Sequence, residues 1–227
     1  PALALQDWMA IQGMMILSPW LTWQDLTKRP ETQAERLRKH SPIECVREAL
    51  RRLEGLGCEA ETVVRMVPGR ALMDLDGTRW EDIRHIHRYV SVSDQSTADS
   101  LIPALLRMPA AVRGVSLEPM IGPVDLFEFL PRIEYDYVDM FDPGFSTCIA
   151  GVDHVIVGGE SGKQARPCDL AWILSVVEQC REAGVPCFVK QMGAKPVING
   201  VPTSEMGSKG QNFGEWPIEL QVREEVR

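Results

Sequence analysis

The chain has 227 residues and a formal net charge of -8, with 44% hydrophobic and 25% charged residues. This length and composition are typical of a globular protein with a sizeable core, and the acidic balance disfavours non-specific binding to DNA phosphates. No apolar run approaches the ~20 residues of a membrane span, and the start of the chain lacks the basic residues of a secretory signal. We therefore expect a cytoplasmic protein with no membrane partner.

The first part of the chain is predicted to contain helices around one strand. Apolar residues at helical spacing predict a helix over 5–16, and a strand is predicted over 20–27. Pro30 suits the first turn of a helix that runs to about His40.

A further helix is predicted to begin at Pro42 and to end at Gly55. Residues 58–80 have weak periodicity, and we interpret them as part of an insertion near 41–86.

Four more strands are predicted downstream, each of them apolar and each followed by polar residues or glycine: 88–93, 112–117, 153–158 and 185–189. Thr97 is predicted to cap a helix over 98–107. Asp169 and Gly184 are predicted to begin and end a helix over 170–183. Residues 128–152 are interpreted as a long loop excursion, and residues 194–227 as a C-terminal extension that packs on the surface or runs beyond the sheet.

Six cysteines are spread through the chain without C-x-x-C or C-x-x-x-C spacing: Cys45, Cys58, Cys148, Cys168, Cys180 and Cys187. Such thiols stay reduced in a cytoplasmic protein, so no disulfide framework is expected. We interpret them as small buried hydrophobic residues and predict no metal site.

The predicted order, five strands mostly separated by helices, favours a parallel sheet or barrel with right-handed crossovers. Five strands are fewer than the eight that close a TIM barrel. Parallel strands bring their carboxyl ends to one edge, where ligands of such folds bind. The polar and glycine residues at the five predicted strand ends are therefore the candidate site: Lys28 and Arg29; Ser93, Asp94 and Gln95; Glu118; Gly158, Gly159, Glu160 and Ser161; and Lys190 and Gln191.

The residue types at these ends suit a zwitterion, a nucleotide or a phosphate. Gly158 and Gly159 would let backbone N–H groups approach an anion, although a plain tight turn explains them equally well. Glu118 would bind an amine or hydroxyl group or act as a base, unless it merely pairs with Arg166, Arg113 or Lys190.

Three cations are the candidates for holding an anion. Lys190 would hold a carboxylate or phosphate, or would neutralise Glu160. Arg166 follows the glycine turn and would fold over it as an anion clamp. Lys28 precedes a predicted helix, where a solvated side chain is the usual alternative.

Several segments together resemble an uncharacterised family of phage- and prophage-associated proteins. They are TWQDLTKRPE (22–31), YVSVSDQSTAD and IPALLRMPAAVRGVSLEPMIGPVDL (within 89–126), HVIVGGESGKQARP (154–167) and QCREAGVPCFVKQMG (179–193). The match covers the middle and C-terminal parts of that family, in the family's order. Its members resemble radical-SAM barrels, so the resemblance implies a partial or incomplete TIM-type barrel over 1–193 in a bacterial host cell.

The resemblance implies the ligand-binding C-terminal part of an enzyme acting on a nucleotide, nucleic acid or peptide. By resemblance, the family's recurring motifs include Lys28, Ser93, Glu118, Gly158, Gly159, Glu160, Ser161 and Lys190. We assign Glu118 and Lys190 as catalytic, and the other six, with Arg166, to cofactor binding. Family members usually begin with a cysteine-rich segment, and this chain contains no C-x-x-x-C-x-x-C run. S-adenosylmethionine and an iron–sulfur cluster are therefore expected only with additional N-terminal residues.

Two alternatives remain. The first is a cluster-free binding or assembly protein that keeps the scaffold, with its open sheet edges covered by a partner, a second copy or the chain's own tail. The second is a different small-molecule enzyme that uses Glu118 and Lys190 directly.

Overall fold

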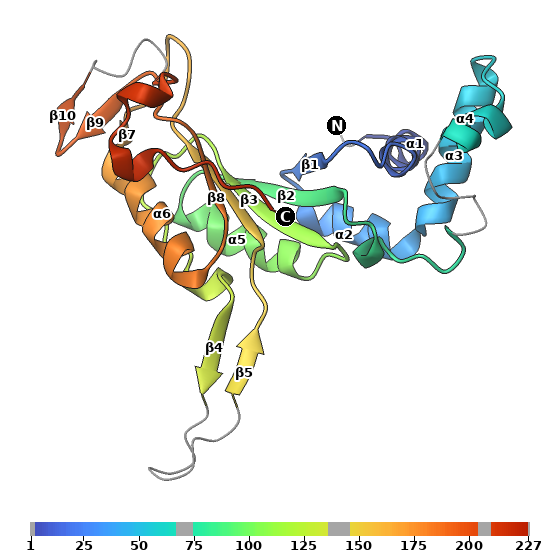
Figure 1. The fold of residues 1–227 in the computed structure, drawn as a ribbon, viewed down its shortest axis with the longest axis horizontal. Coiled ribbons are helices and arrows are strands. Elements are labelled where there is room, and N and C mark those ends of the chain that lie inside the picture. The colour runs from blue at the N-terminus through green and yellow to red at the C-terminus, as the bar shows by residue number, and fades with distance from the viewer. Residues whose placement is uncertain (1–2, 67–74, 136–145, 204–209, 227) are drawn as a thin grey trace. The chain divides into compact units, whose positions relative to one another are not determined.

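The computed structural model describes residues 3–66, 75–135, 146–203 and 210–226. It shows a mixed α/β protein whose main feature is a five-stranded parallel sheet (Figure 1). The strands of this sheet, in spatial order, are β1 (Trp23–Thr27), β2 (Ile86–Val92), β3 (Val112–Leu117), β6 (His154–Gly158) and β8 (Cys187–Gln191). The five predicted strands are thus confirmed, with shifted ends. No closed barrel is found within the described residues.

Six α-helices are described: α1 (Leu5–Ile16), α2 (Pro30–Lys39), α3 (Pro42–Gly55), α4 (Ala60–Met66), α5 (Gln95–Leu106) and α6 (Leu170–Ala183). None of them is long and apolar enough to cross a membrane. Between α3 and β2, the predicted insertion near 41–86 contains α4 and a short 3-10 helix at Trp80–Asp82, and its residues 67–74 lie outside the described ranges.

The small strands form two further sheets. β4 (Arg132–Tyr135) pairs antiparallel with β5 (Ser146–Ile149), so the predicted excursion over 128–152 contains two paired strands. Residues 136–145 between them lie outside the described ranges. The other sheet has the order β10-β9-β7 and consists of β7 (Cys168–Asp169), β9 (Pro196–Ile198) and β10 (Val201–Pro202).

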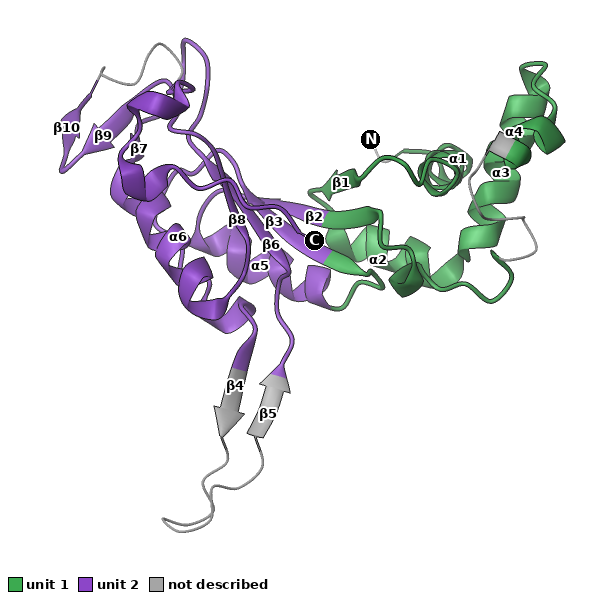
Figure 2. Ribbon diagram, viewed as in Figure 1, with its two compact units in different colours: residues 1–88, 107–112 green, residues 89–106, 113–227 purple. Residues whose placement is uncertain are grey.

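The chain divides into two compact units (Figure 2). Unit 1 comprises residues 1–88 and 107–112, and unit 2 comprises residues 89–106 and 113–227.

Unit 1 contains a close pair of helices, α1 and α3. A Cβ atom on Gly13 would lie 2.1 Å from the Cys45 carbonyl oxygen, so only glycine permits this approach. At the start of α3, the Ser41 N–H donates to Glu44 Oε2 at 2.7 Å in a capping box. Cys45 and Ala49 are buried on the inner side of α3, as the hydrophobic pattern requires.

Unit 2 contains the apolar centre of the sheet. Val115 of β3 is in register with Val155 of β6, and both are buried. α6 begins and ends as predicted: Asp169 accepts a hydrogen bond from the Ala171 N–H at 3.0 Å, and Gly184 has a φ of 68°. That positive φ favours glycine, which explains why the helix stops there.

The predicted start of α5 is wrong. The helix begins at Gln95, and its first turn is capped by Asp94, whose carboxylate accepts the Thr97 N–H at 2.9 Å. The Thr97 hydroxyl instead accepts the Ser93 and Asp94 N–H groups. Asp94 and Thr97 are both suitable N-cap residues, and the prediction considered only Thr97.

The C-terminal tail covers the outer edge of β8. The Val189 N–H donates to the Val222 carbonyl oxygen, and the Glu224 N–H donates to the Cys187 carbonyl oxygen, both at 2.9 Å. Trp216 and Leu220 of the tail are buried. The chain's own tail therefore protects this edge, one of the three covers considered for an incomplete sheet.

Candidate functional site

The carboxyl ends of β2, β3, β6 and β8 bring five of the predicted residues together in unit 2. The Ile121 N–H donates to the Ser93 carbonyl oxygen at 2.9 Å, which joins the end of β2 to the loop after β3. A Cβ atom on Gly158 would lie 3.0 Å from Glu118 Oε1. Gly159 follows directly, and Lys190 reaches the same place from β8.

Glu118 and Lys190 form an ion pair at this edge, although 72 residues separate them. Lys190 Nζ lies 3.0 Å from Glu118 Oε2, and the Ser116 hydroxyl donates to the same oxygen at 3.3 Å. The Glu118 side chain is 17% exposed and the Lys190 side chain 56% exposed. Among the pairings considered for Glu118, the structure therefore selects Lys190, in a position that solvent reaches.

Gly158 and Gly159 let the backbones of β6 and β8 come close together. A Cβ atom on Gly159 would lie 2.4 Å from the Met192 carbonyl oxygen. The Gly159 N–H donates to the Gln191 carbonyl oxygen at 3.0 Å, and the Gln191 amide donates back to the Gly159 carbonyl oxygen at 2.9 Å. Because its N–H is used in this way, Gly159 serves strand packing rather than anion binding in this structure.

Glu160 and Arg166 pair with each other across the turn after β6. Arg166 donates from Nε to Glu160 Oε2 at 2.7 Å and from Nη2 to Oε1 at 3.1 Å, and its backbone N–H adds a third bond. These hydrogen bonds lower the pKa of Glu160 to about 2. Arg166 thus clamps a carboxylate of its own chain, and Ser161 lies exposed in the turn.

Lys28 lies in unit 1, directly after β1, and is exposed. It lines a pocket of about 450 Å³ together with Arg29 and Asp25. The sequence analysis overlooked Asp25 and also Arg88 of β2, which are joined in a buried ion pair. The available signal was a charged residue within each predicted strand, Asp25 near the end of 20–27 and Arg88 at the start of 88–93, where apolar residues are usual.

Comparison with known proteins places the chain in a family. The model of a family described as a protein of unknown function, DUF5131, matches residues 4–216. The chain belongs to this family. No curated protein matches it, and no solved structure does. The description of this family names no activity.

Among the described residues, the cysteines are not grouped as the ligands of an iron–sulfur cluster. Within the described ranges, no group of three or more His, Cys, Asp or Glu side chains is placed to hold a metal ion. Burial raises the pKa of Cys45 and of Cys168 to about 12, so both thiols are protonated at neutral pH. Cys45, Cys168, Cys180 and Cys187 are buried as predicted, and the Cys148 side chain lies outside the described part. The prediction is wrong for Cys58, which is exposed.

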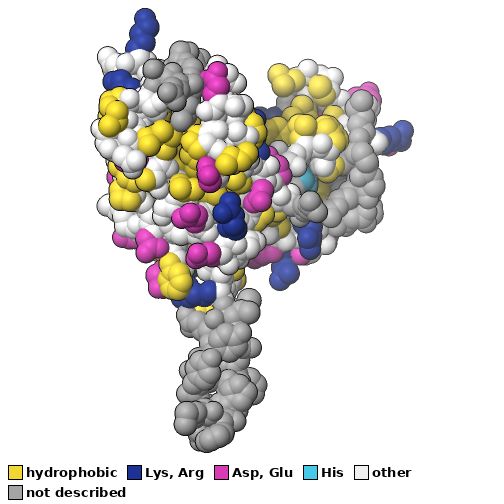
Figure 3. Space-filling model, turned by 60° about the vertical axis from the view of Figure 1, so that its left-hand side comes forward, with side chains coloured by type: hydrophobic (Ala, Val, Ile, Leu, Met, Phe, Trp, Pro, Cys, Tyr) yellow, Lys and Arg dark blue, Asp and Glu magenta, His cyan; other side chains and the backbone are white. Residues whose placement is uncertain are grey.

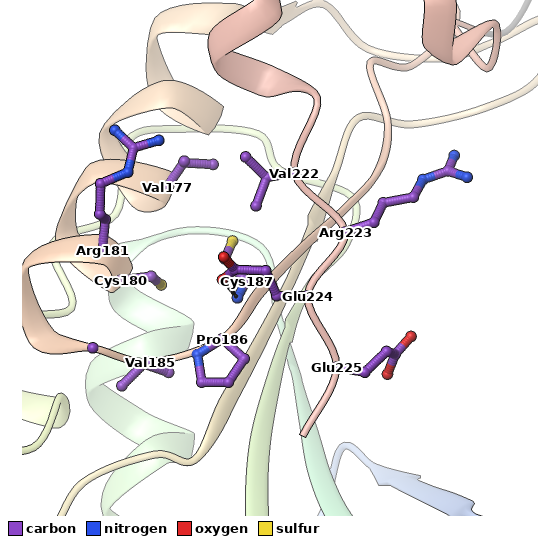
Figure 4. A pocket seen from close by; sticks show the side chains of 11 residues that line it. Val177, Cys180, Arg181, Val185, Pro186, Cys187, Val222, Arg223, Glu224 and Glu225 are labelled. Carbon is purple, nitrogen blue, oxygen red and sulfur yellow. Dashed lines mark hydrogen bonds between the residues drawn. The ribbon is translucent and has the colours of Figure 1, made fainter. Parts of the chain in front are cut away.

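A hollow of about 760 Å³ in unit 2 lies between α6, the start of β8 and the C-terminal tail (Figure 4). Arg181, Arg223, Glu224 and Glu225 contribute charges of both signs to its lining. The two glutamates offset the two arginines, so this hollow has no clear preference for an anion or a cation.

The surface charge agrees with the acidic composition. On the face shown in Figure 3, acidic and basic side chains are interspersed over the described surface and form no continuous basic patch. Proteins that bind DNA phosphates non-specifically present a basic patch or stripe, which this face lacks.

Proposed function

We propose that this DUF5131 protein is the ligand-binding part of a radical-SAM-like barrel enzyme that acts on a nucleotide, nucleic acid or peptide. The ligand would bind at the carboxyl edge of unit 2. The observation that carries this proposal is the solvent-accessible pair of Glu118 and Lys190, which meet at the ends of β3 and β8.

The strand order supports a barrel-type scaffold. The five parallel strands follow one another in space in the order in which they occur in the chain. A doubly wound sheet reverses its strand order at a switch point, whereas a singly wound (β/α) barrel does not. The proposed scaffold is therefore a partial TIM-type barrel, with the site at the edge where such barrels bind their ligands.

The chemistry of the edge suits a ligand with two kinds of polar group. Glu118 would accept an N–H or O–H of the ligand, and Lys190 would bind its carboxylate or phosphate. A ligand that supplies both groups replaces the internal ion pair without leaving either charge unpaired. An exposed pair contributes only about 0–1 kcal/mol to stability, so its separation is energetically accessible.

The amino-acid end of S-adenosylmethionine carries both kinds of group, an ammonium and a carboxylate, and so fits Glu118 and Lys190. When bound, S-adenosylmethionine would supply the group that reacts with the substrate. The described thiols are not grouped to hold a cluster.

Equilibrium dialysis with S-adenosylmethionine tests this proposal on the 227-residue chain and, where the gene encodes more, on the whole gene product. Glu118→Gln and Lys190→Gln should each weaken binding by about tenfold, because each removes one charge-assisted hydrogen bond. The matched control is Glu35→Gln with Lys39→Gln, an exposed ion pair at 2.6 Å on α2. The proposal would be refuted if both edge variants bound S-adenosylmethionine as tightly as the parent. It would also be refuted if neither the 227-residue chain nor the whole gene product bound it.

A cluster-free binding or assembly protein is the second candidate. It is favoured by the absence of a metal-ligating group within the described ranges. Its discriminating measurement is the iron content of the anaerobically purified whole gene product, together with its oligomeric state by light scattering. A stable partner complex without iron would favour this candidate, and stoichiometric iron would exclude it.

A further inference from the structure

The C-terminal tail pairs with the outer edge of β8 at the start of that strand (Figure 4). Arg223 forms an antiparallel bridge with Phe188, and its guanidinium lies 4.6 Å from the centre of the Phe213 ring. The Glu224 N–H donates to the Cys187 carbonyl oxygen at 2.9 Å, and the Glu224 carboxylate accepts the Cys187 N–H at 3.1 Å. Glu224 therefore covers both backbone groups of the strand at this point.

His154, the first residue of β6, makes a further contact to Glu224. Its ring nitrogen Nε2 lies 2.9 Å from the Glu224 carbonyl oxygen, and its Nδ1 lies 2.5 Å from the Tyr89 hydroxyl of β2. A carbonyl oxygen only accepts hydrogen bonds, so Nε2 must carry a proton and donate it. In a neutral ring Nδ1 is then the acceptor, and the Tyr89 hydroxyl donates to it. The neutral ring satisfies both contacts.

A charged ring does not fit this arrangement. His154 and Tyr89 are each 1% exposed. A second ring proton would lie on Nδ1 and face the hydroxyl oxygen, so the hydroxyl hydrogen would have to turn away. Within the described chain the Tyr89 hydroxyl has no other hydrogen-bond partner. Protonation of the ring would therefore leave a buried donor unpaired and a buried charge poorly solvated.

The charged groups around the ring offset this cost only in part. Burial lowers the pKa of His154, and the hydrogen bond to the Glu224 backbone and the negative charges of Glu225 and Glu224 act in the opposite direction with less effect. Asp153 precedes the ring in the chain, and its carboxylate accepts the N–H of Arg113 on β3 at 2.7 Å. The neutral ring is thus the favoured form while the tail is attached.

His154 is the group of unit 2 whose charge changes near neutral pH. The other three histidines of the sequence all belong to unit 1: His40, His85 and His87. Among the titratable neighbours of the ring, Tyr89 keeps its proton because burial raises its pKa. Cys187 also stays protonated, because a hydrogen bond with Cys180 and burial raise its pKa. Carboxylates are ionised throughout this range.

We propose that the C-terminal tail is held to β8 by a pH-sensitive contact and is released when His154 takes up a proton. The ring becomes accessible to water once Glu224 has moved away, and the charged form is then no longer penalised. Because the pKa of His154 is lowered while the tail is attached, the attachment is complete above pH 6.5 and weakens as the pH falls below that value. Release leaves the Cys187 backbone groups unpaired, as at an open sheet edge.

Hydrogen exchange of the Glu224 amide in the 227-residue chain tests this proposal. Its protection factor, corrected for the intrinsic exchange rate at each pH, should fall by about tenfold between pH 7.5 and pH 5.5. That is the shift expected when a group of pKa 6.5 takes up its proton only after release. The Gly159 amide, which donates to the Gln191 carbonyl oxygen at the other end of β8, is the control and should keep its protection factor.

Two variants separate the titration of the ring from its packing. In His154→Gln the side chain stays neutral, and its amide offers a donor to Glu224 and an acceptor to Tyr89, so the protection factor should no longer depend on pH. Glu225→Gln removes a carboxylate of the tail and is the matched control, which should keep the tenfold change.

The proposal is overturned if the Glu224 amide of the parent is equally protected at pH 7.5 and pH 5.5. It is also overturned if His154→Gln loses protection as the parent does, because the loss would then come from other groups. Should His154→Gln fail to fold, the pH profile of the parent decides. A loss that begins only below about pH 5, where carboxylates titrate, would also overturn the proposal.

Discussion

The Asp25–Arg88 pair of unit 1 and the Glu118–Lys190 pair of unit 2 each join a carboxylate to a cation, yet their surroundings differ. Arg88 is 2% exposed, and Asp25 also accepts hydrogen bonds from two glutamine amides. Lys190 is 56% exposed, and among the described residues only the Ser116 hydroxyl donates to the Glu118 carboxylate beside it. A buried pair cannot be separated without leaving a charge in a poorly solvated place, whereas an exposed pair separates at little cost. The buried pair therefore maintains the fold, and the exposed pair is available for a ligand.

The largest effect on stability is expected when the buried ion pair of Asp25 and Arg88 is broken. Arg88→Met leaves Asp25 without its counter-charge and should lower the free energy of unfolding by about 3–5 kcal/mol, measured by urea denaturation. The double variant Arg88→Met with Asp25→Leu removes both charges and should lose less than the single variant. A single variant as stable as the parent would show that the pair does not stabilise unit 1.

The second-largest effect on stability is expected where the backbones at the ends of β6 and β8 come close together. Gly159→Ala places a methyl group 2.4 Å from the Met192 carbonyl oxygen and should cost about 1–3 kcal/mol in thermal unfolding. Gly214→Ala is the matched control, because nothing lies within 4 Å of its new Cβ atom. Equal stability of the two variants would contradict the packing role assigned to Gly159.

The ion pair of Glu160 and Arg166 should make the stability of the folded state depend on pH. Its hydrogen bonds lower the pKa of Glu160 from 4.5 to about 2, so the pair stabilises the folded state above pH 4.5. This contribution is lost as the pH falls from 4.5 towards 2. Glu160→Gln should therefore be less stable than the parent at pH 6, and the difference should vanish near pH 2. A difference that does not change with pH would argue against this ion pair.

The smallest effect on stability is expected when the Glu118–Lys190 pair is broken, in contrast to the buried Asp25–Arg88 pair. Lys190→Gln should change the free energy of unfolding by less than about 1 kcal/mol, because the side chain is half-exposed. Chemical denaturation measures this value beside the large loss in Arg88→Met. A loss of about 3 kcal/mol in Lys190→Gln would mean that this pair, too, is structural.

Much of the local structure could be predicted from the sequence, because helix ends depend on neighbouring residues. Pro30, Pro42, Asp169 and Gly184 mark helix ends that the structure confirms. The start of α5 was predicted wrongly because Asp94 and Thr97 offer two capping groups three residues apart. The residues of the candidate edge in unit 2 were also predicted, since parallel strands must bring their carboxyl ends together.

The sequence by itself determined the order of the elements, the five apolar strands and the polar residues at their ends, because these signals act over a few neighbouring positions. Only the tertiary structure decided that Glu118 pairs with Lys190, that Arg88 is buried beside Asp25, and that the C-terminal tail covers β8. These contacts join residues far apart in the chain. Which charges become buried or paired depends on how the strands and helices pack, and no local pattern specifies that.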